Sequence, residues 1–476
     1  MVFSSLFFLY LFLPLNLIIY YFAKSVKARN IVMLIFSLIF YAWGEPVYVL
    51  LLLFMALCDW LISLYIGKQT PHCGKAKLGL AMMAVVNIGL LGFFKYGTFV
   101  LENIGLIAGR DFGTLDIILP IGISFYTFQL VSYVVDVYRG DVPAQKNFTT
   151  LLLYVSLFHQ CIAGPIVRYK DICAELIERR ATMQDIADGT WRFSFGLAKK
   201  AILANAMGNV AGKLLLEGDA ITTSTTLGLW IGVLAYSLQI YLDFSAYSDM
   251  AIGMGRMIGI HYRENFDYPY ISRSVTEFWR RWHISLGSFF RDYVYIPLGG
   301  NRKGKLRTYL NLFIVWFLTG LWHGASWNFV LWGLYFFVFI FFEKLFLSKL
   351  LSKDHIVSHL YLVIIVYFGW ILFRFESTSE ILAVLRGMFG LNGNAFTNFE
   401  TNTIVSSNMF ILIFCVIVST PIVRKLGDMA RYTYMDKKSV SVIYTIGRIT
   451  IPLLLLLLST AALVGNTFNP FLYFQF

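Results

Sequence analysis

The chain has 476 residues, of which 58% are hydrophobic and only 14% are charged, and its formal net charge is +12. Soluble domains are about half apolar and about a quarter charged, so this composition excludes an ordinary soluble enzyme and indicates a polytopic membrane protein. The positive charge lies between apolar stretches and not on one soluble module. This distribution argues against nucleic-acid binding and favours loops that face the headgroups of a lipid bilayer.

A membrane-spanning helix needs roughly 20 apolar residues, and about 11 stretches come near that length. They lie at residues 5–22, 31–43, 47–66, 78–94, 116–135, 227–245, 309–322, 324–347, 358–373, 406–423 and 449–465. The first has no small-residue cleavage site and is soon followed by another apolar run, so we expect a retained helix and not a removed signal peptide. We expect an all-α bundle of about 11 transmembrane helices that forms a single membrane-embedded domain over residues 1–476.

Basic loops set the expected orientation, because cytoplasmic loops of membrane proteins are enriched in Lys and Arg. The loop after the first span (24–29) is basic, as are residues 68–77 and 424–438. Placing all three loops in the cytoplasm puts the N-terminus outside, and the last span then delivers residues 466–476 to the outer side. We therefore expect both termini to be extracytoplasmic.

Two regions are too short or too charged to be clean spans. They are the segment 153–165 and the region around His283. Irregular backbone at membrane depth is stable only inside protein or beside a water-filled cavity. We therefore expect re-entrant segments that line a central cavity.

His323 is the first candidate catalytic residue. It lies in "FLTGLWHGASWNFVLWGLYFF", between two apolar stretches and beside Gly320, Gly324 and Ala325. An ionisable residue in such a setting indicates function, and small neighbours let a substrate or a second helix approach the imidazole. The sequence leaves two roles open for it: a general base near neutral pH, or a histidine that hydrogen-bonds between helices.

His283 is the second candidate, in "TEFWRRWHISLGSFFRDYVYIPLGGNR". A basic, aromatic segment of this kind often lies in the membrane interface. Alternatively, it forms a cytoplasmic vestibule whose charges attract a phosphate-bearing cosubstrate and whose rings stack on the base of that cosubstrate. The candidate donor-binding residues are Trp279, Arg280, Arg281, Trp282 and Arg291.

A polar cluster lies in the second half of the apolar helix expected at 227–245 and in the residues that follow it. Its members are Gln239, Asp243, Ser245, Tyr247, Ser248 and Asp249. The two carboxylates are six positions apart and do not share one helix face, so a paired-carboxylate mechanism is not indicated. Polar contacts between helices are the favoured role.

Several signatures of other chemistries are absent from the sequence. The 5 cysteines form no CxxC pair, so neither a disulfide framework nor a zinc site is suggested, and we expect no bound metal or cofactor. There is no GxSxG elbow and no Walker A loop. The HxxxxD arrangement of soluble-site glycerolipid acyltransferases is also missing.

Three stretches resemble the membrane-bound O-acyltransferase family. They are "AGPIVRY" (163–169), "NFDYPYISRSVTEFWRRWHISLGSFFRDYVYIPLGGNR" (265–302) and "GLWHGASWNFVLWG" (320–333). The resemblance runs from the first span to the last residues. It is greatest to the bacterial branch that O-acetylates polysaccharides such as alginate and peptidoglycan. It implies that His323 is the catalytic histidine and that His283 is a second functional histidine. It also implies that the protein lies in the bacterial inner membrane.

The segment "NPFLYFQF" (469–476) holds the third candidate catalytic residue, Tyr473. An aromatic anchor at the membrane surface is one interpretation. The other comes from the pattern F-x-Y-x-x-F at Phe471, Tyr473 and Phe476. It is similar to the end of a small peptide partner in teichoic-acid D-alanylation, and this resemblance implies a tyrosine that carries the acyl group.

The sequence thus predicts an O-acyltransferase that takes an acetyl group from acetyl-CoA in the cytoplasm. By resemblance, an extracytoplasmic SGNH-type partner passes the group to a polysaccharide acceptor. One alternative is an acyltransferase that acts directly on a lipid or a teichoic acid, for which the C-terminal tyrosine has no use. The other is a transporter whose histidines relay protons, but the half-sequence repeats typical of transporters are not visible.

Overall fold

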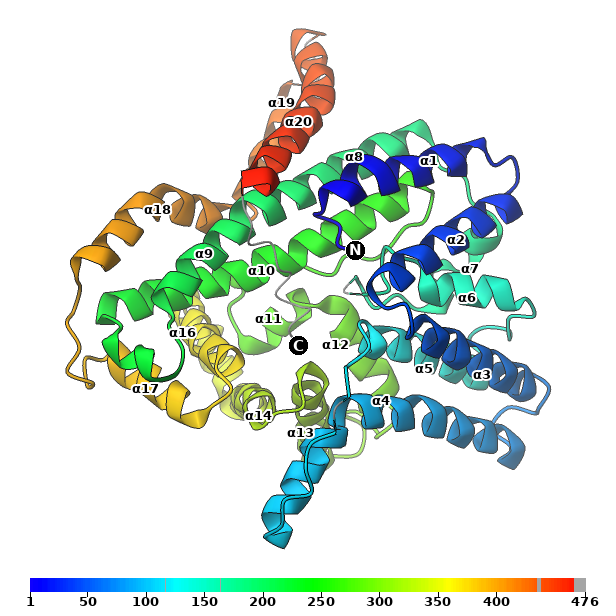
Figure 1. Ribbon diagram of the computed structural model, residues 1–476, viewed down its shortest axis with the longest axis horizontal. Coiled ribbons are helices and arrows are strands. Elements are labelled where there is room, and N and C mark those ends of the chain that lie inside the picture. The colour runs from blue at the N-terminus through cyan, green and yellow to red at the C-terminus, as the bar shows by residue number, and fades with distance from the viewer. Residues whose placement is uncertain (116, 163, 435–437, 466–476) are drawn as a thin grey trace. The chain divides into compact units, whose positions relative to one another are not determined.

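The computed structural model describes residues 1–115, 117–162, 164–434 and 438–465, and every regular element within those ranges is a helix (Figure 1). The predicted all-α fold is therefore confirmed. The tail 466–476, with Tyr473, lies outside the described residues.

The chain divides into two compact units. Unit 1 comprises Met1–Phe193, Ser248–Glu264 and Ser288–Pro297, and unit 2 comprises Ser194–Tyr247, Asn265–Gly287 and Leu298–Phe476. The candidate histidines His283 and His323 both belong to unit 2. The prediction of a single membrane-embedded domain stays a prediction.

Unit 1 contains the first helices of the chain. They are η1 (Phe8–Phe12), α1 (Leu13–Phe22), α2 (Val26–Gly44), α3 (Val49–Gly67), α4 (Gly74–Ala108), α5 (Ile123–Arg139), α6 (Phe148–Ser156), α7 (Tyr169–Ile177) and most of α8 (Met183–Ala198). The end of α10 (Thr226–Met257) and the π-helical turn η5 (Arg291–Tyr295) complete it. Within this unit α3 packs against α4 and α5, and α2 packs against α6.

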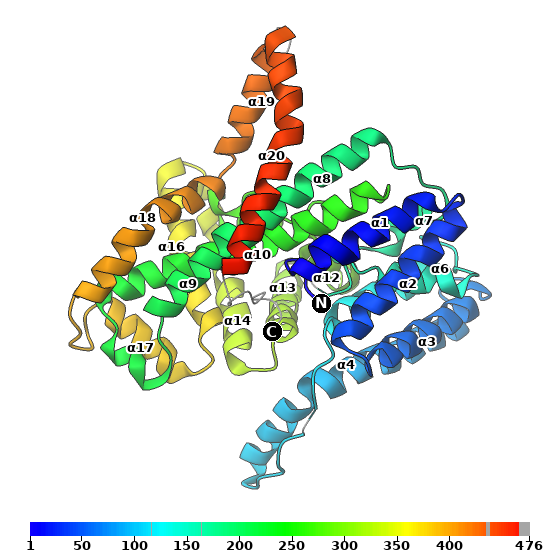
Figure 2. The same ribbon diagram turned by 45° about the horizontal axis from the view of Figure 1, so that its top comes forward.

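Unit 2 contains most of the remaining helices. They are η2 (Lys199–Ala204), α9 (Asn205–Leu214), η3 (Gly218–Thr223), η4 (Pro269–Ile271), α11 (Val275–Arg281), α12 (Ile284–Phe290, up to Gly287), α13 (Lys305–His323), α14 (Trp327–Phe342), η6 (Glu343–Leu347), α15 (Ser348–Leu351), α16 (His355–Arg374), α17 (Thr378–Met388), α18 (Phe399–Val418), α19 (Ile422–Tyr434) and α20 (Lys438–Gly465). The first part of α10 also belongs here. α13 packs along α14, and α19 lies beside α20 in both views (Figures 1 and 2).

Eight helices in the described part of the chain are long and apolar enough to cross a membrane. They are Val26–Gly44, Val49–Gly67, Gly74–Ala108, Thr226–Met257, Trp327–Leu351, His355–Arg374, Phe399–Val418 and Tyr444–Gly465. The other three predicted stretches also contain helices. Those at 5–22 and 116–135 contain helices shorter than 18 residues. The stretch at 309–322 lies in α13, which is long enough but includes Lys305, Arg307 and His323.

The two regions expected not to form spans are indeed short and broken. α6 has nine residues and is followed by a buried turn at 158–162, and α11 and α12 have seven residues each. Ser274 is the N-cap of α11, and its Oγ accepts a hydrogen bond from the Glu277 backbone N–H at 3.0 Å. This N-cap satisfies a donor that a helix start leaves unpaired.

A buried carboxylate also caps α11. Glu343, on η6, is only 2% exposed. Its oxygens accept hydrogen bonds from the backbone N–H groups of Val275 and Thr276 at 2.6 and 2.9 Å, and from Thr276 Oγ1 at 2.6 Å. Because a helix N-terminus favours negative charge, Glu343 stabilises α11 and ties it to the end of α14.

The polar residues of α10 hold helices together, as the sequence predicted. In unit 2, Lys200 Nζ lies 2.8 Å from Asp243 Oδ1, and both side chains are almost fully buried. In unit 1, Arg192 Nη2 lies 2.8 Å from Asp249 Oδ1. The two carboxylates therefore bond to different residues, each within its own unit, which is consistent with their spacing of six residues.

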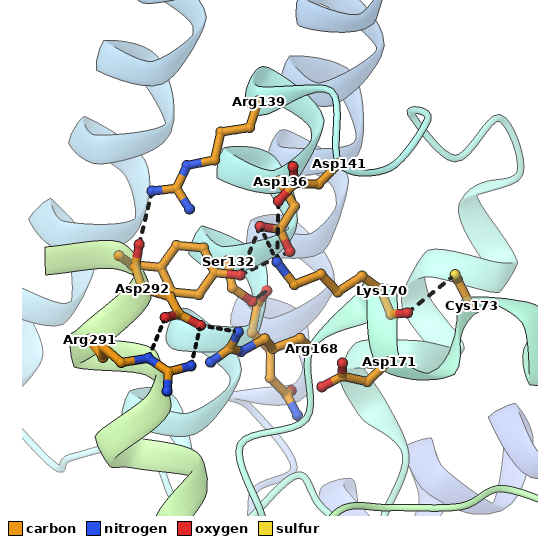
Figure 3. A network of polar contacts seen from close by, with 12 residues as sticks. Ser132, Asp136, Arg139, Asp141, Arg168, Lys170, Asp171, Cys173, Arg291 and Asp292 are labelled. Carbon is orange, nitrogen blue, oxygen red and sulfur yellow. Dashed lines mark hydrogen bonds and ion pairs between the residues drawn. The ribbon is translucent and has the colours of Figure 1, made fainter. Parts of the chain in front are cut away.

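Unit 1 contains a second polar network, centred on Asp136 of α5 (Figure 3). Asp136 is fully buried, and its carboxylate accepts hydrogen bonds from the Tyr293 hydroxyl at 2.8 and 2.9 Å and from Lys170 Nζ at 3.1 Å. Lys170 Nζ also reaches the exposed Asp141 at 3.3 Å. The network thus joins α5, α7 and η5.

Asp292 extends this network. Arg168 Nη1 donates to Asp292 Oδ2 at 2.6 Å, and Arg291 Nε donates to Asp292 Oδ1 at 2.7 Å. Partial burial alone would raise the pKa of Asp292, but these two hydrogen bonds outweigh it and hold the pKa below its usual value. Arg139, Arg168 and Lys170 also lie against the Tyr293 ring, with cation-to-centroid distances of 5.2, 5.3 and 5.8 Å.

Asp136 and Asp141 provide a matched test of this network, because both pair with Lys170 but only Asp136 is buried. Removing one partner of a buried pair costs roughly 3–5 kcal/mol, whereas an exposed pair contributes at most about 1 kcal/mol. We expect Asp136→Asn to lower the free energy of unfolding by about 2–3 kcal/mol, since Lys170 is partly exposed. Asp141→Asn should cost less than about 1 kcal/mol. SDS-induced unfolding in detergent micelles measures both, and equal losses would contradict the assignment.

Candidate active site

His283 occupies a turn between α11 and α12 and is 2% exposed. Its backbone has a φ of 44°, in the left-handed region that side chains with a Cβ rarely adopt. Such a conformation is retained only where surrounding contacts hold it, and it is frequent at functional sites.

Asn265 supplies those contacts. Its Oδ1 accepts hydrogen bonds from Ser285 N at 3.2 Å and Ser285 Oγ at 2.8 Å, and its backbone carbonyl accepts from Ile284 N at 2.9 Å. His283 Nδ1 lies 3.2 Å from the same Asn265 Oδ1. The Ser285 N–H can only donate, so it identifies this atom as the amide oxygen, and a His283 Nδ1 that bonds to it carries the proton. Ser285 Oγ also lies 3.3 Å from the same Nδ1, but this hydroxyl donates to Asn265 Oδ1 over the shorter distance of 2.8 Å. In this tautomer the lone pair of the neutral ring is on Nε2.

The surroundings keep His283 neutral. Burial lowers its pKa to about 3, far below the usual value near 6.5. The Phe244 ring lies against the imidazole in an edge-on arrangement, with centroids 4.7 Å apart. At neutral pH His283 is thus an uncharged imidazole that accepts a hydrogen bond at Nε2 more readily than it takes up a proton.

His323 is the last residue of α13 and is 6% exposed. Three aromatic rings surround its imidazole: Trp322 and Trp332 at 4.9 Å each and Phe373 at 5.2 Å between centroids. Gly324 follows in an extended conformation and ends the helix.

Trp322 connects the two candidate histidines. Its ring centroid is 5.8 Å from that of His283 and 4.9 Å from that of His323. The two motifs, forty residues apart in the sequence, therefore meet within unit 2. This juxtaposition did not follow from the spacing of the residues.

Four of the five candidate donor-binding residues are consecutive, at the end of α11 in unit 2, but their side chains have different surroundings. Trp282 is buried and Trp279 is partly buried, and both pack in the aromatic core of unit 2 against rings such as Phe278. Arg280 is exposed, and Arg281 pairs with Glu277 at 3.0 Å and Asp267 at 3.2 Å. Arg291 belongs to unit 1, where it pairs with Asp292. Donor binding by these side chains stays a prediction.

Several residues that hold the site together were missed by the sequence analysis. Asn265 and Glu343 shape the His283 segment, and Lys200 meets Asp243. Glu343 and Lys200 lie in or beside apolar runs, and that setting was a usable signal, since buried charges in such runs need partners. Asn265 gave no comparable signal. His159 is buried in unit 1, with Nδ1 at 3.3 Å from the Tyr262 hydroxyl.

The described part of the chain is all helical, holds eight candidate spans and buries two adjoining histidines, as expected of an integral membrane protein. Comparison with known sequences identifies its family. The model of the membrane-bound O-acyltransferase family matches residues 142–379, which include both histidines. The chain belongs to this family and is a membrane acyltransferase.

Named relatives agree with this assignment. The chain is 37% identical to the probable alginate O-acetylase AlgI of Pseudomonas putida over all of both chains. It is 34% identical to the peptidoglycan O-acetyltransferase of Helicobacter pylori over 83% of this chain and 80% of that protein. Similarity to the teichoic acid D-alanyltransferase of Bacillus subtilis is lower, at 29% over 44% of this chain and 55% of that protein.

The small residues around His323 let helices approach one another. A Cβ on Gly320 would lie 2.4 Å from the Phe329 carbonyl oxygen, and one on Gly333 would lie 2.4 Å from that of Trp316. Of the two approaches that the sequence left open, substrate or second helix, the second helix is therefore present at Gly320.

This contact predicts the effect of one added methyl group. Gly333→Ala should destabilise the protein by about 1–3 kcal/mol, because the carbonyl of a packed helix cannot move away cheaply. Gly89→Ala, in α4, is the matched control: nothing lies within 4 Å of the added Cβ, and Ala favours the helix by up to about 1 kcal/mol. SDS-induced unfolding compares the two, and a stable Gly333→Ala protein would contradict the close packing of α13 on α14.

Proposed function

We propose that the protein moves an acetyl group from cytoplasmic acetyl-CoA across the bacterial inner membrane for O-acetylation of an extracytoplasmic polysaccharide, such as alginate or peptidoglycan. The observation that carries this proposal is the burial of His323 and His283 against one shared ring, that of Trp322. The named activities of the relatives, one matched over all of both chains and one over about four fifths of each, support the acetyl group and the polysaccharide acceptor.

His323 acts as the general base in this proposal. An acceptor hydroxyl attacks the thioester carbonyl carbon of the donor while the imidazole removes the hydroxyl proton. The C–S bond then breaks, and the imidazolium returns the proton to the departing thiolate. The products are an oxygen ester and free coenzyme A.

His283 has a supporting role. A neutral imidazole with its lone pair on Nε2 can accept a hydrogen bond and orient a bound group, but its low pKa makes it a weak base. The basic side chains nearby in the sequence, above all the exposed Arg280, would attract the phosphates of the donor.

Tyr473 is the proposed first acceptor. Its ordinary pKa near 10 means that the hydroxyl needs a base at neutral pH, and a phenol ester is a good leaving group for a second transfer. An extracytoplasmic SGNH-type partner would take the acetyl group from Tyr473 and pass it to the polymer. Direct transfer to a lipid or a teichoic acid is the alternative, and it makes Tyr473 dispensable.

The catalytic assignment predicts that His323→Ala lowers polymer O-acetylation by about 10²–10⁴-fold while the protein stays abundant in the membrane. His283→Ala should raise the KM for the donor more than it lowers kcat. His355→Ala, at an exposed position of α16, should keep wild-type activity. Acetylation of the polymer in cells, with the protein level checked by blot, tests this. Near-normal transfer by a stable His323→Ala protein would refute the assignment.

The relay predicts that Tyr473→Phe abolishes acetylation although the protein inserts normally, because one oxygen is lost and the ring is kept. An aromatic anchor predicts the reverse order. Losing the ring of Phe471 or Phe476 would then cost roughly 1.5–3 kcal/mol of burial, and Tyr473→Phe would be silent. Wild-type acetylation in cells that carry Tyr473→Phe would leave Tyr473 an anchor.

The direction of transfer depends on the orientation of the chain. Cys73, a native cysteine in the basic loop 68–77, should react with a maleimide only from the cytoplasm. Asn466→Cys should react only from outside. Labelling of Asn466→Cys from the cytoplasm alone would reverse the proposed placement of the tail and remove the direction of the relay.

A further inference from the structure

Helix α19 (Ile422–Tyr434) has two chemically distinct faces. Residues spaced by three or four positions share one face of a helix. Ile422, Leu426 and Met429 follow that spacing, and they are 49%, 57% and 58% exposed. Val423 adjoins them and is 50% exposed. The helix thus leaves a continuous apolar face exposed on the described chain.

The other face is charged. Arg424 and Asp428 are one turn apart, with Arg424 Nε 3.8 Å from Asp428 Oδ2, and their side chains are 68% and 54% exposed. Gly427 lies between the two faces on the polar side, and nothing lies within 4 Å of a Cβ built there. Along residues 424–438 the sequence has five basic residues and two acidic ones, which gives a net charge of +3.

The neighbours of α19 place it at a membrane boundary. α18, a candidate span, ends at Val418, and only three residues separate it from α19. The next candidate span begins at Tyr444. α19 contacts both α18 and α20. A 13-residue helix with this much charge cannot itself cross a bilayer, yet it is held within a few residues of two helices that can.

These observations indicate what covers the exposed apolar face. We propose that α19 docks on an anionic lipid surface, with Ile422, Val423, Leu426 and Met429 inserted among the acyl chains and the basic face at the level of the headgroups. Large exposed apolar side chains beside excess positive charge are the features by which a helix binds such a surface. The basic composition of 424–438 predicts that this loop lies in the cytoplasm, where the leaflet is anionic. The inference does not rest on the proposed acetyl transfer.

A depth measurement on the full-length protein tests the docking. An environment-sensitive fluorophore is attached to Leu426→Cys in one protein and to Gly427→Cys in another. In both proteins the five native cysteines are replaced, and elution in detergent must match that of the wild type. Both proteins are placed in nanodiscs of phosphatidylglycerol with spin-labelled lipid. We expect the lipid quencher to quench the probe at 426 severalfold more than the probe at 427, and aqueous iodide to show the opposite preference.

Charge is tested separately. The double substitution Arg424→Gln and Lys425→Gln should reduce lipid quenching of the probe at position 426. The protein with both basic residues intact should show the same reduction when the nanodiscs contain phosphatidylcholine in place of phosphatidylglycerol. Equal quenching in the two lipids would overturn the anionic preference. Equal iodide access at 426 and 427 would overturn docking altogether. Protection of 426 that is accompanied by maleimide crosslinking between two copies would instead assign the apolar face to a dimer.

Discussion

A buried charge in this apolar protein is stable only where another part of the chain meets it, and this constraint organises both units. Desolvating an ion costs several kcal/mol even after relaxation, so each buried carboxylate described here is paired or hydrogen-bonded. Asp136 meets Lys170 and Tyr293 in unit 1 (Figure 3). Asp243 meets Lys200, and Glu343 meets the first turn of α11, in unit 2. Each partnership joins segments far apart in the sequence, and the contact with Glu343 fixes the start of α11, the short helix that leads to His283.

Burial also sets the surroundings of the two histidines to which the proposed transfer chemistry is assigned. His283 is held by Asn265 in a backbone conformation that it would not adopt alone, and burial keeps it uncharged. His323 is enclosed by aromatic rings at the end of α13. Water exclusion strengthens a hydrogen bond made inside such a site, because the local dielectric is low. Two imidazoles with different surroundings allow the proton-transfer role and the positioning role to be divided between them.

Composition and periodicity were enough to predict the helical membrane fold, because long apolar stretches have few other solutions in a bilayer. The candidate histidines were identified from their apolar settings and from their motifs. Partner identity was not predictable: nothing in the spacing connects Glu343 with Val275 or Trp322 with both imidazoles, since such contacts depend on how helices pack. The packing of the aromatic residues near His283 was not predictable either. Trp279 and Trp282 contribute to the core of unit 2, which the basic, aromatic pattern of the segment did not indicate, and their part in donor binding stays a prediction.

The bond between Glu343 and α11 also has a consequence for the order in which the protein is made. The acceptor follows its donor Val275 by 68 residues, so the ribosome finishes α11, α12 and the turn at His283 well before the capping carboxylate exists. Until α14 is synthesised, the first turn of α11 must keep its backbone donors hydrated, because an apolar environment would leave them unpaired. The cap on α11 can therefore form only after the helix pair that contains His323 has been made.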